Sequence, residues 1–360
     1  MSMAIAEKAR ARLQKAVRSS FVEMYIRLPG TGKPACDTGR ITSSCNYTRL
    51  FMNRELAMRC LIIHNPASGP RSDEIFDFAR ALSEAGDEVC LRFIGDGMEP
   101  HQAAEDVSAF DRVVVSGGDG TVSNVLDHIR DSHVPTLVFP SGTANLFFNN
   151  IGNAPEPAAL AKACREGRTK TADMGELFWK AEDGSIQRHG FIIIAGTGFD
   201  ADIMHKAEPA KGDMGEIAYF LSALANPAPT VAHFTIEHDG KVDELDGIGC
   251  MVGNTSLIQN DINLFPDCRM DDGFIDIAVI QPAKTVELLP TLLAGVLDPA
   301  GKGLGRPQFT LFQAKEARIT CTPSLGMEFD GELIHNNTGE FGARVLPACL
   351  DLIVDDFAKL

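Results

Sequence analysis

Apolar and polar positions alternate in blocks over the first part of the chain that shows a regular pattern, from about residue 59 to residue 167. Short, almost wholly apolar runs predict buried strands at Cys60–His64, Val89–Phe93, Arg112–Val115 and Thr136–Phe139. Apolar positions at helical spacing predict helices at Asp73–Glu84, Pro100–Ala109, Val122–Ile129 and Pro157–Gly167. Strands that alternate with helices indicate a doubly wound parallel sheet with right-handed crossovers.

From about residue 169 the pattern changes, and predicted strands follow one another through turns. The strands are expected at Gly190–Ala195, Ala232–His238, Lys241–Leu245, Ile248–Val252, Phe274–Ile280 and Arg318–Thr322. Asp239-Gly240 is a hairpin signal between two of them, and one helix is expected at Met214–Ala225. This order of elements predicts a second domain that is mainly antiparallel β.

Residues 1–57 have a different character. Residues 1–58 carry ten Lys and Arg against four Asp and Glu, whereas the whole chain has a net charge of −16. Ile5, Leu13, Val17 and Phe21 recur at helical spacing among basic residues. Two interpretations stay open, a disordered basic extension and an amphipathic helix that contacts a membrane.

Composition narrows the class of protein. A chain of 360 residues suits two domains. The strongly acidic remainder argues against a nucleic-acid partner. No apolar run reaches the roughly 18–20 residues that span a bilayer. The nine cysteines lack metal-ligand spacing, so we expect reduced thiols and no zinc site. Together these features predict a cytoplasmic protein.

The most informative motif is a glycine-rich turn between a predicted strand and a predicted helix. It reads Gly117-Gly118-Asp119-Gly120-Thr121. Backbone N–H groups in such a turn, with the helix N-terminus behind them, can bind a phosphate. Asp119 is placed to meet a metal or a ribose hydroxyl, and we expect it to contribute little to packing. A tight turn without a ligand is the alternative, and the motif is neither a Walker A loop nor a dinucleotide fingerprint.

Two further polar motifs also follow predicted strands. Asn65-Pro66-Ala67-Ser68-Gly69 follows the first strand, and Pro140-Ser141-Gly142-Thr143-Ala144-Asn145 follows the fourth. The carboxyl ends of parallel strands lie at one edge of a sheet, where ligands bind in open α/β folds. We therefore expect all three motifs to line one crevice.

These motifs resemble those of the superfamily of diacylglycerol kinases and sphingosine kinases, which shares the glycine-rich signature with NAD kinases. Asp271-Asp272-Gly273 and Asp330-Gly331-Glu332 match two later motifs in the same order, so the resemblance covers about residues 58–360. It implies a nucleotide-binding α/β domain over 58–168, completed by 343–360, and a β-rich lipid and metal domain over 169–342. The Thr-Pro-Thr-Gly-Ser-Thr-Ala stretch typical of NAD kinases is absent.

The resemblance also implies ATP and Mg²⁺ as cofactors and assigns roles to residues. The nucleotide-binding residues would be Asn65, Pro66, Ser68, Gly69, Gly117, Gly118, Asp119, Gly120, Thr121, Gly142 and Thr143. Mg²⁺ would be held by Asp272 and by the backbone carbonyls of Arg269 and Phe274, with Asp173 in the same network. Glu332 would be the general base that takes the proton from a lipid hydroxyl, and Asp330 would support it. Asp200, in the stretch Gly196–Ala201, either supports the site or belongs to a turn.

The sequence departs from the family pattern at two places. Ser123-Asn124 stands where the family usually has Asn-Glu, and Leu146 stands where an Asp is frequent. Both changes remove a carboxylate from the neighbourhood of the nucleotide and the metal, so a weak or inactive kinase stays open.

The sequence therefore predicts an ATP-dependent lipid kinase that meets its lipid at a membrane surface. The lipid is left open between diacylglycerol, a sphingoid base and another long-chain alcohol, and a homodimer is also left open. An NAD kinase and a non-catalytic lipid- or nucleotide-binding module are the alternatives.

Overall fold

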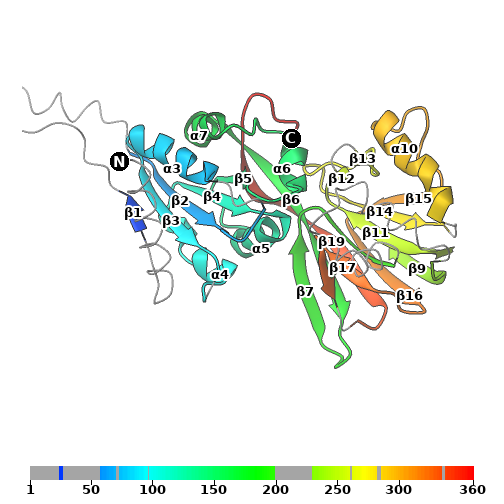
Figure 1. Cartoon of the computed structure of the whole chain (residues 1–360). Helices are drawn as coiled ribbons and strands as arrows, with labels where there is room; N and C mark the ends of the chain where they lie inside the picture. Colours follow the sequence, from blue (N-terminus) through cyan, green and yellow to red (C-terminus); the bar gives the residue numbers. More distant parts are fainter. Residues whose placement is uncertain are drawn as a thin grey trace, which may run out of the picture.

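The computed structural model describes residues 24–26, 57–69, 73–95, 97–198, 229–259, 262–281, 285–334 and 337–360. Figure 1 shows a helix-flanked sheet formed by the earlier part of the chain and a β-rich part formed by the later one. The helix expected at Met214–Ala225 and the basic segment Ile5–Phe21 lie outside the described residues.

A parallel sheet forms the centre of the first part. Its strands are β2 (Arg59–His64), β3 (Glu88–Phe93), β4 (Arg112–Gly117) and β5 (Thr136–Pro140), in the order β3-β2-β4-β5. Their middle residues are buried because helices cover the sheet, as the continuous apolar runs predict. β1 (Met24–Ile26) pairs with β3 in antiparallel register, where the sequence analysis expected no strand.

The helices described in this part are α3 (Glu74–Glu84), α4 (Pro100–Ala103), α5 (Asp119–Ile129), α6 (Leu146–Ile151) and α7 (Pro157–Glu166). Four of them, α3, α5, α6 and α7, pack apolar side chains on the sheet, whereas the short α4 packs on α5. The single helix expected at Pro100–Ala109 is wrong: α4 is followed by a separate 3₁₀ turn, η1 (Val107–Ala109). The Arg92 guanidinium binds the Ala103 carbonyl and the Asp106 carboxylate, which interrupts the helical hydrogen bonding.

The second part is built from two packed sheets. One is antiparallel, in the order β15-β14-β11-β8-β17-β18. Its strands are β8 (Ile194–Gly198), β11 (Gly249–Gly253), β14 (Ile275–Ile280), β15 (Phe309–Ala314), β17 (Met327–Phe329) and β18 (Glu332–Ile334). A short pair, β12 (Leu257–Gln259) and β13 (Ile262–Asn263), stands apart, and η3 (Thr285–Leu288) leads into α10 (Leu289–Leu297).

The other sheet continues the parallel sheet of the first part. It adds β6 (Arg168–Lys180), β7 (Ile186–Phe191), β9 (Ala232–His238), β10 (Lys241–Gly247), β16 (Glu316–Thr322) and β19 (Glu340–Val354). The β9–β10 hairpin turns at Asp239-Gly240, as predicted, and both residues have positive φ. One strand expected at Gly190–Ala195 is instead split between β7 and β8, because the backbone of Ile192 and Ile193 turns toward Asp330.

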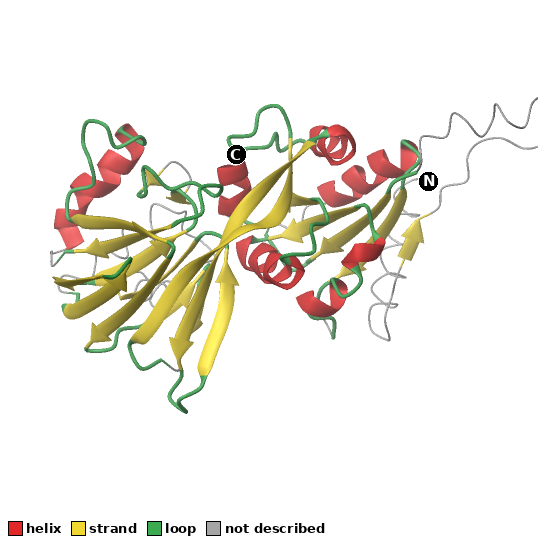
Figure 2. Cartoon of the chain, turned by 180° about the vertical axis from the view of Figure 1, so that it is seen from behind, coloured by secondary structure: helices red, strands yellow, loops and turns green. Residues whose placement is uncertain are grey.

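β19 connects the two parts. Its Leu352 pairs in parallel with Thr136 of β5, and its other residues pair in antiparallel register with β6 and β16. The result is one sheet of eleven strands that runs through both parts (Figure 2). Among the helices that the structure describes, none is both long and apolar enough to cross a bilayer.

Candidate active site

Three loops meet at the carboxyl ends of β2, β4 and β5, and glycine allows them to touch backbone to backbone. A Cβ atom on Gly142 would lie 2.5 Å from the Cα atom of Gly118. A Cβ atom on Gly69 would lie 2.2 Å from the Ser141 carbonyl oxygen, and Gly69 has a φ of +56°. The predicted convergence of the three motifs is therefore confirmed, and any side chain at Gly69 or Gly142 would push the loops apart.

Side chains from the ends of the same strands fix the loops. The Asn65 amide donates to the Thr121 hydroxyl at 2.8 Å. The Ser116 hydroxyl is 2.9 Å from His64 Nδ1 and 2.7 Å from the Ser141 hydroxyl. His64 is buried, and this burial lowers the pKa of its imidazole. The Ser116 hydroxyl therefore links the three strand ends, and its partner His64 is a neutral imidazole near neutral pH.

The helix expected at Val122–Ile129 begins three residues earlier, so Asp119 is the first residue of α5 and has a structural role there. Its two carboxylate oxygens accept the backbone N–H groups of Leu146 at 3.1 Å and Phe147 at 3.0 Å, at the start of α6. Burial raises the pKa of Asp119, and these two hydrogen bonds oppose the increase. The expectation that Asp119 contributes little to packing is wrong, because the side chain joins α5 to α6.

Asp330 joins the turn between β17 and β18 to both parts of the molecule. Its carboxylate accepts the Ser123 hydroxyl of α5 at 2.5 Å. It also accepts the N–H groups of Ile192, Ile193 and Ile194 at 2.7, 2.9 and 3.0 Å. Burial raises the pKa of Asp330 to about 6, although four hydrogen bonds favour the charged form. With four hydrogen bonds to the protein, the Asp330 carboxylate holds the two parts together and does not face a substrate.

Glu332 lies across from the glycine-rich turn. Its side chain is exposed, and its Oε1 atom accepts a hydrogen bond from the Asn124 amide at 3.0 Å. The same Oε1 atom lies 3.5 Å from the position that a Cβ atom on Gly120 would occupy. Although Gly120 and Glu332 are 212 positions apart in the chain, the fold brings a carboxylate of the second part to the turn of the first.

The predicted metal residues belong to another turn, which Asp173 holds. The buried Asp173 carboxylate accepts the N–H groups of Gly273 and of Ala348, both at 2.7 Å. Asp272 accepts the Phe274 N–H at 3.0 Å, and its pKa is raised by burial and further by the negative charge of Asp173. A half-buried carboxylate with an acidic neighbour suits a hard cation.

The described residues contain no group of three or more His, Cys, Asp or Glu side chains arranged to hold a metal ion. The Arg269 side chain is directed to Asp271, at 2.9 Å. Of the stretch Gly196–Ala201, Gly196–Gly198 belongs to β8, whereas Asp200 lies outside the described residues.

Comparisons with known proteins agree with this arrangement. Residues 59–177 match the family model "Diacylglycerol kinase catalytic domain", and residues 193–354 match the "YegS C-terminal NAD kinase beta sandwich-like domain". The two matches together cover more than three quarters of the chain. The chain combines a diacylglycerol kinase catalytic domain with a YegS-type C-terminal domain.

Similar proteins carry the same family name. A diacylglycerol kinase of Mycobacterium tuberculosis is 27% identical over 70% of this chain and 79% of its own length. One from Bacillus subtilis is 24% identical over 79% of this chain and 92% of its own length. A crystal structure of a diacylglycerol kinase from Bacillus anthracis is 22% identical, covers 83% of this chain and 98% of its own, and has a TM-score of 0.66. This likeness confirms the predicted two-domain fold.

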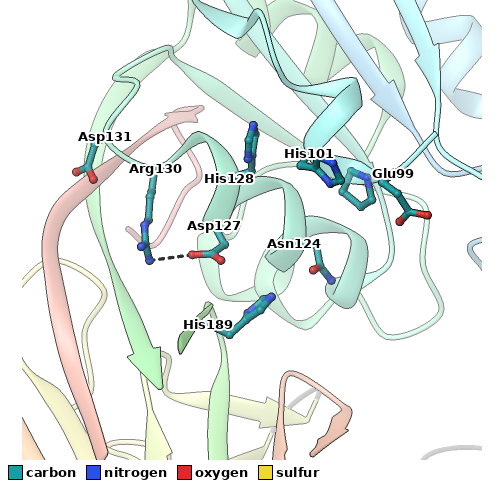
Figure 3. Close-up of a pocket in the computed structure, with 9 residues that line it drawn as sticks. Glu99, His101, Asn124, Asp127, His128, Arg130, Asp131 and His189 are labelled. Carbon is teal, nitrogen blue, oxygen red and sulfur yellow. Dashed lines mark hydrogen bonds and ion pairs between the residues drawn. The ribbon is translucent and has the colours of Figure 1, made fainter. Parts of the chain in front are cut away.

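A polar pocket with a volume of about 510 Å³ lies beside α5 (Figure 3). It is lined by Glu99, Pro100, His101, Asn124, Asp127, His128, Arg130, Asp131 and His189. The Arg130 guanidinium is already bound to Asp127 at 2.8 Å. Because Asn124 both lines the pocket and binds Glu332, the pocket extends to the neighbourhood of that carboxylate.

Sequence reasoning missed several residues that build the site. Ser123 and Asn124 were noted only as departures from a motif, although they contact Asp330 and Glu332. Asn254 is buried, and its amide donates to the carbonyls of Asp173 and Ile192. A lone asparagine after an apolar run was the available signal, and it is too common to single out Asn254.

Proposed function

We propose that the chain is an ATP-dependent lipid kinase that transfers the γ-phosphoryl group to a lipid hydroxyl. The observation that carries this proposal is the placement of the Glu332 carboxylate beside Gly120 of the glycine-rich turn. A phosphate-binding turn next to a positioned carboxylate provides the two parts that phosphoryl transfer to an alcohol needs.

The nucleotide phosphates would bind at the three glycine loops. Their backbone N–H groups and the N-terminus of α5 offer partial positive charge to an anion. These N–H groups would be held in place before ATP binds by two sets of contacts. One is the hydrogen bond between Asn65 and Thr121, and the other is the pair of hydrogen bonds that Asp119 accepts from the start of α6. Positioning of this kind supplies much of the catalysis in phosphoryl transfer.

Glu332 would accept the proton of the attacking hydroxyl as the new phosphate ester forms. Its exposed side chain is open to an acceptor that approaches from solvent or from a membrane surface. Asp330 would hold the backbone beneath it through its four hydrogen bonds. Mg²⁺ bound by Asp272 would offset the negative charge of the phosphates, and Asp173 would keep the Asp272 turn in place.

The acceptor class follows from the relatives, which are named diacylglycerol kinases. A lipid acceptor also implies that the enzyme works at a membrane surface, as a peripheral protein. The polar wall of the pocket beside α5 suits hydroxyl and charged groups rather than acyl chains.

The experiment is a phosphorylation assay with [γ-³²P]ATP and Mg²⁺ on the full chain. Diacylglycerol and a sphingoid base are offered in mixed micelles, and NAD is offered in solution. We expect a labelled lipid product and no labelled NAD. Labelled NAD would establish the NAD kinase alternative. Binding of ATP and lipid without turnover would identify a non-catalytic module and overturn the proposal.

A further inference from the structure

Two consecutive residues of α5 contact both acids of the turn that carries Glu332. Ser123 donates to Asp330 at 2.5 Å, and Asn124 donates to Glu332 at 3.0 Å. Both contacts cross from the first part of the molecule to the second. They arise at the two neighbouring positions where the sequence departs from the motif.

The donor role of Asn124 is fixed by its surroundings. Its Nδ2 atom lies 2.9 Å from the Gly120 carbonyl oxygen and 3.0 Å from the Glu332 Oε1 atom. Both partners are acceptors, and an amide nitrogen carries two hydrogens, so each hydrogen has a partner. The opposite amide orientation would place an oxygen against two oxygens.

We propose that Asn124 is a positioning residue for Glu332, an inference that rests on the proposed function. The amide donates both to the Glu332 carboxylate and to the Gly120 carbonyl of the glycine-rich turn. It therefore keeps the base at a fixed position relative to the phosphates that the turn would bind. A neutral donor does this without a second negative charge beside Glu332. A carboxylate at position 124 would repel Glu332 and would accept no hydrogen bond from it. The loss of a carboxylate at this position is therefore compatible with an active kinase.

A double-mutant cycle tests the proposal on the full chain. The variants Asn124→Ala and Asn124→Asp are made in the wild type and in Glu332→Gln, and kcat and KM are measured for ATP and for the lipid that the wild type phosphorylates. Asn150→Ala is the matched control. The Asn150 amide also donates to the carbonyl four residues earlier, at 2.9 Å, and to a carbonyl of the second part, Leu257, at 3.0 Å.

We expect Asn124→Ala to lower kcat about tenfold, with the KM for ATP changed less than about twofold, because one hydrogen bond to a charged group is lost. Asn124→Asp has the same shape as asparagine and should lower kcat further, because it adds repulsion. In the Glu332→Gln background both changes should alter kcat less than about twofold, since the residue that they act on is already disabled. Asn150→Ala should have the same effect in both backgrounds.

Equal fold-changes for Asn124→Ala in the two backgrounds would overturn the positioning role, as would a kcat of Asn124→Ala equal to that of the wild type. Both results leave the proposed function standing, since the wild type is active in each. A wild type that phosphorylates no lipid overturns the proposed function itself, and the positioning role with it.

Discussion

The proposed role of Glu332 as a base rests on the position of its side chain beside the glycine-rich turn. Replacing it by glutamine keeps the hydrogen bond from Asn124 within reach but removes the proton acceptor. Loss of a positioned base costs about 10²- to 10⁴-fold in rate, and the loose transition state of phosphoryl transfer favours the lower end. We expect kcat of Glu332→Gln to fall about 10²-fold with ATP affinity nearly unchanged.

Steady-state kinetics would measure this change. Glu244→Gln is the control, because Glu244 is an exposed acid on β10. A kcat of Glu332→Gln within about threefold of the wild type would be incompatible with a base.

Asp330 shows two opposing effects at one residue. Its folded pKa of about 6 lies above the unfolded value, so ionisation costs stability as the pH rises through about 6. The charge-neutral Asp330→Asn would avoid this cost, but its NH₂ group would face donors where the carboxylate accepts four hydrogen bonds. Because unsatisfied buried donors cost about 1–3 kcal/mol, we expect the variant to be less stable at pH 8.

Urea unfolding at pH 8 measures the difference, with Ser123→Ala, which removes one of the four donors, as a milder comparison. An Asp330→Asn protein as stable as the wild type would contradict this expectation, because it would mean that the cost of burying the charge fully offsets the hydrogen bonds.

At the scale of elements, the contact of two loops depends on the absence of a side chain. In Gly142→Ala the new Cβ would meet the Gly118 Cα at 2.5 Å and the Asn145 side chain at 2.9 Å. The loops after β4 and β5 must then separate, at a cost of about 1–3 kcal/mol. We expect ATP affinity to fall together with the melting temperature.

Gly303→Ala is the control, because its nearest new contact is at 3.6 Å. ATP binding by Gly142→Ala at wild-type affinity, measured by calorimetry, would show that the loop contact does not shape the nucleotide site.

The link between the ends of β2, β4 and β5 also includes a titrating group, His64. Burial lowers the pKa of His64, so on acidification through the unfolded value of about 6.5 the unfolded chain binds a proton that the native state does not. Stability contributed by neutral His64 is therefore present above that pH and is lost below it. We expect the wild type to lose more stability than His64→Gln between pH 8 and pH 5.

The pH effect of Asp330 is present in both proteins and cancels in this comparison. The free energy of unfolding from urea titrations at each pH gives the result, and parallel pH profiles would contradict it.

The elements that the sequence predicts well are those whose pattern is local. The four parallel strands follow from apolar runs, and the β9–β10 hairpin follows from Asp239-Gly240. The division between β7 and β8 could not be predicted, because it depends on Asp330, more than 130 residues away. For the same reason the motifs predict Glu332, whereas its partner Asn124 becomes visible only when α5 and β18 are side by side.

At the scale of the whole molecule, β19 makes the two parts share one sheet, and Glu176 of β6 lies where they meet. The Glu176 side chain is 2% exposed. It pairs with Arg130 at the end of α5 at 3.3 Å, with Arg188 of β7 at 3.2 Å and with Arg344 of β19 at 2.6 Å. The buried Glu176 carboxylate therefore binds three arginines from three elements. One of these elements is α5, whose other end carries the glycine-rich turn.

Glu176→Gln keeps the size of the side chain and removes the carboxylate that three guanidinium groups share, of which, among the described residues, only Arg130 keeps another acid, Asp127. Breaking a fully buried ion pair from one side costs about 3–5 kcal/mol. The three guanidinium groups here are 31, 52 and 41% exposed, so we expect a smaller loss that still lowers the urea midpoint at pH 7. Glu340→Gln is the matched control: it removes the pair with Lys180 between the same two strands, but both side chains are about half exposed, at 54% and 42%. Such a pair contributes about 0–1 kcal/mol, so the control should unfold almost as the wild type does.

Because Arg130 ends α5, the Glu176 variant should also lose ATP affinity at temperatures where it is still folded. Equal urea midpoints for the two variants would show that the Glu176 cluster does not hold the two parts together.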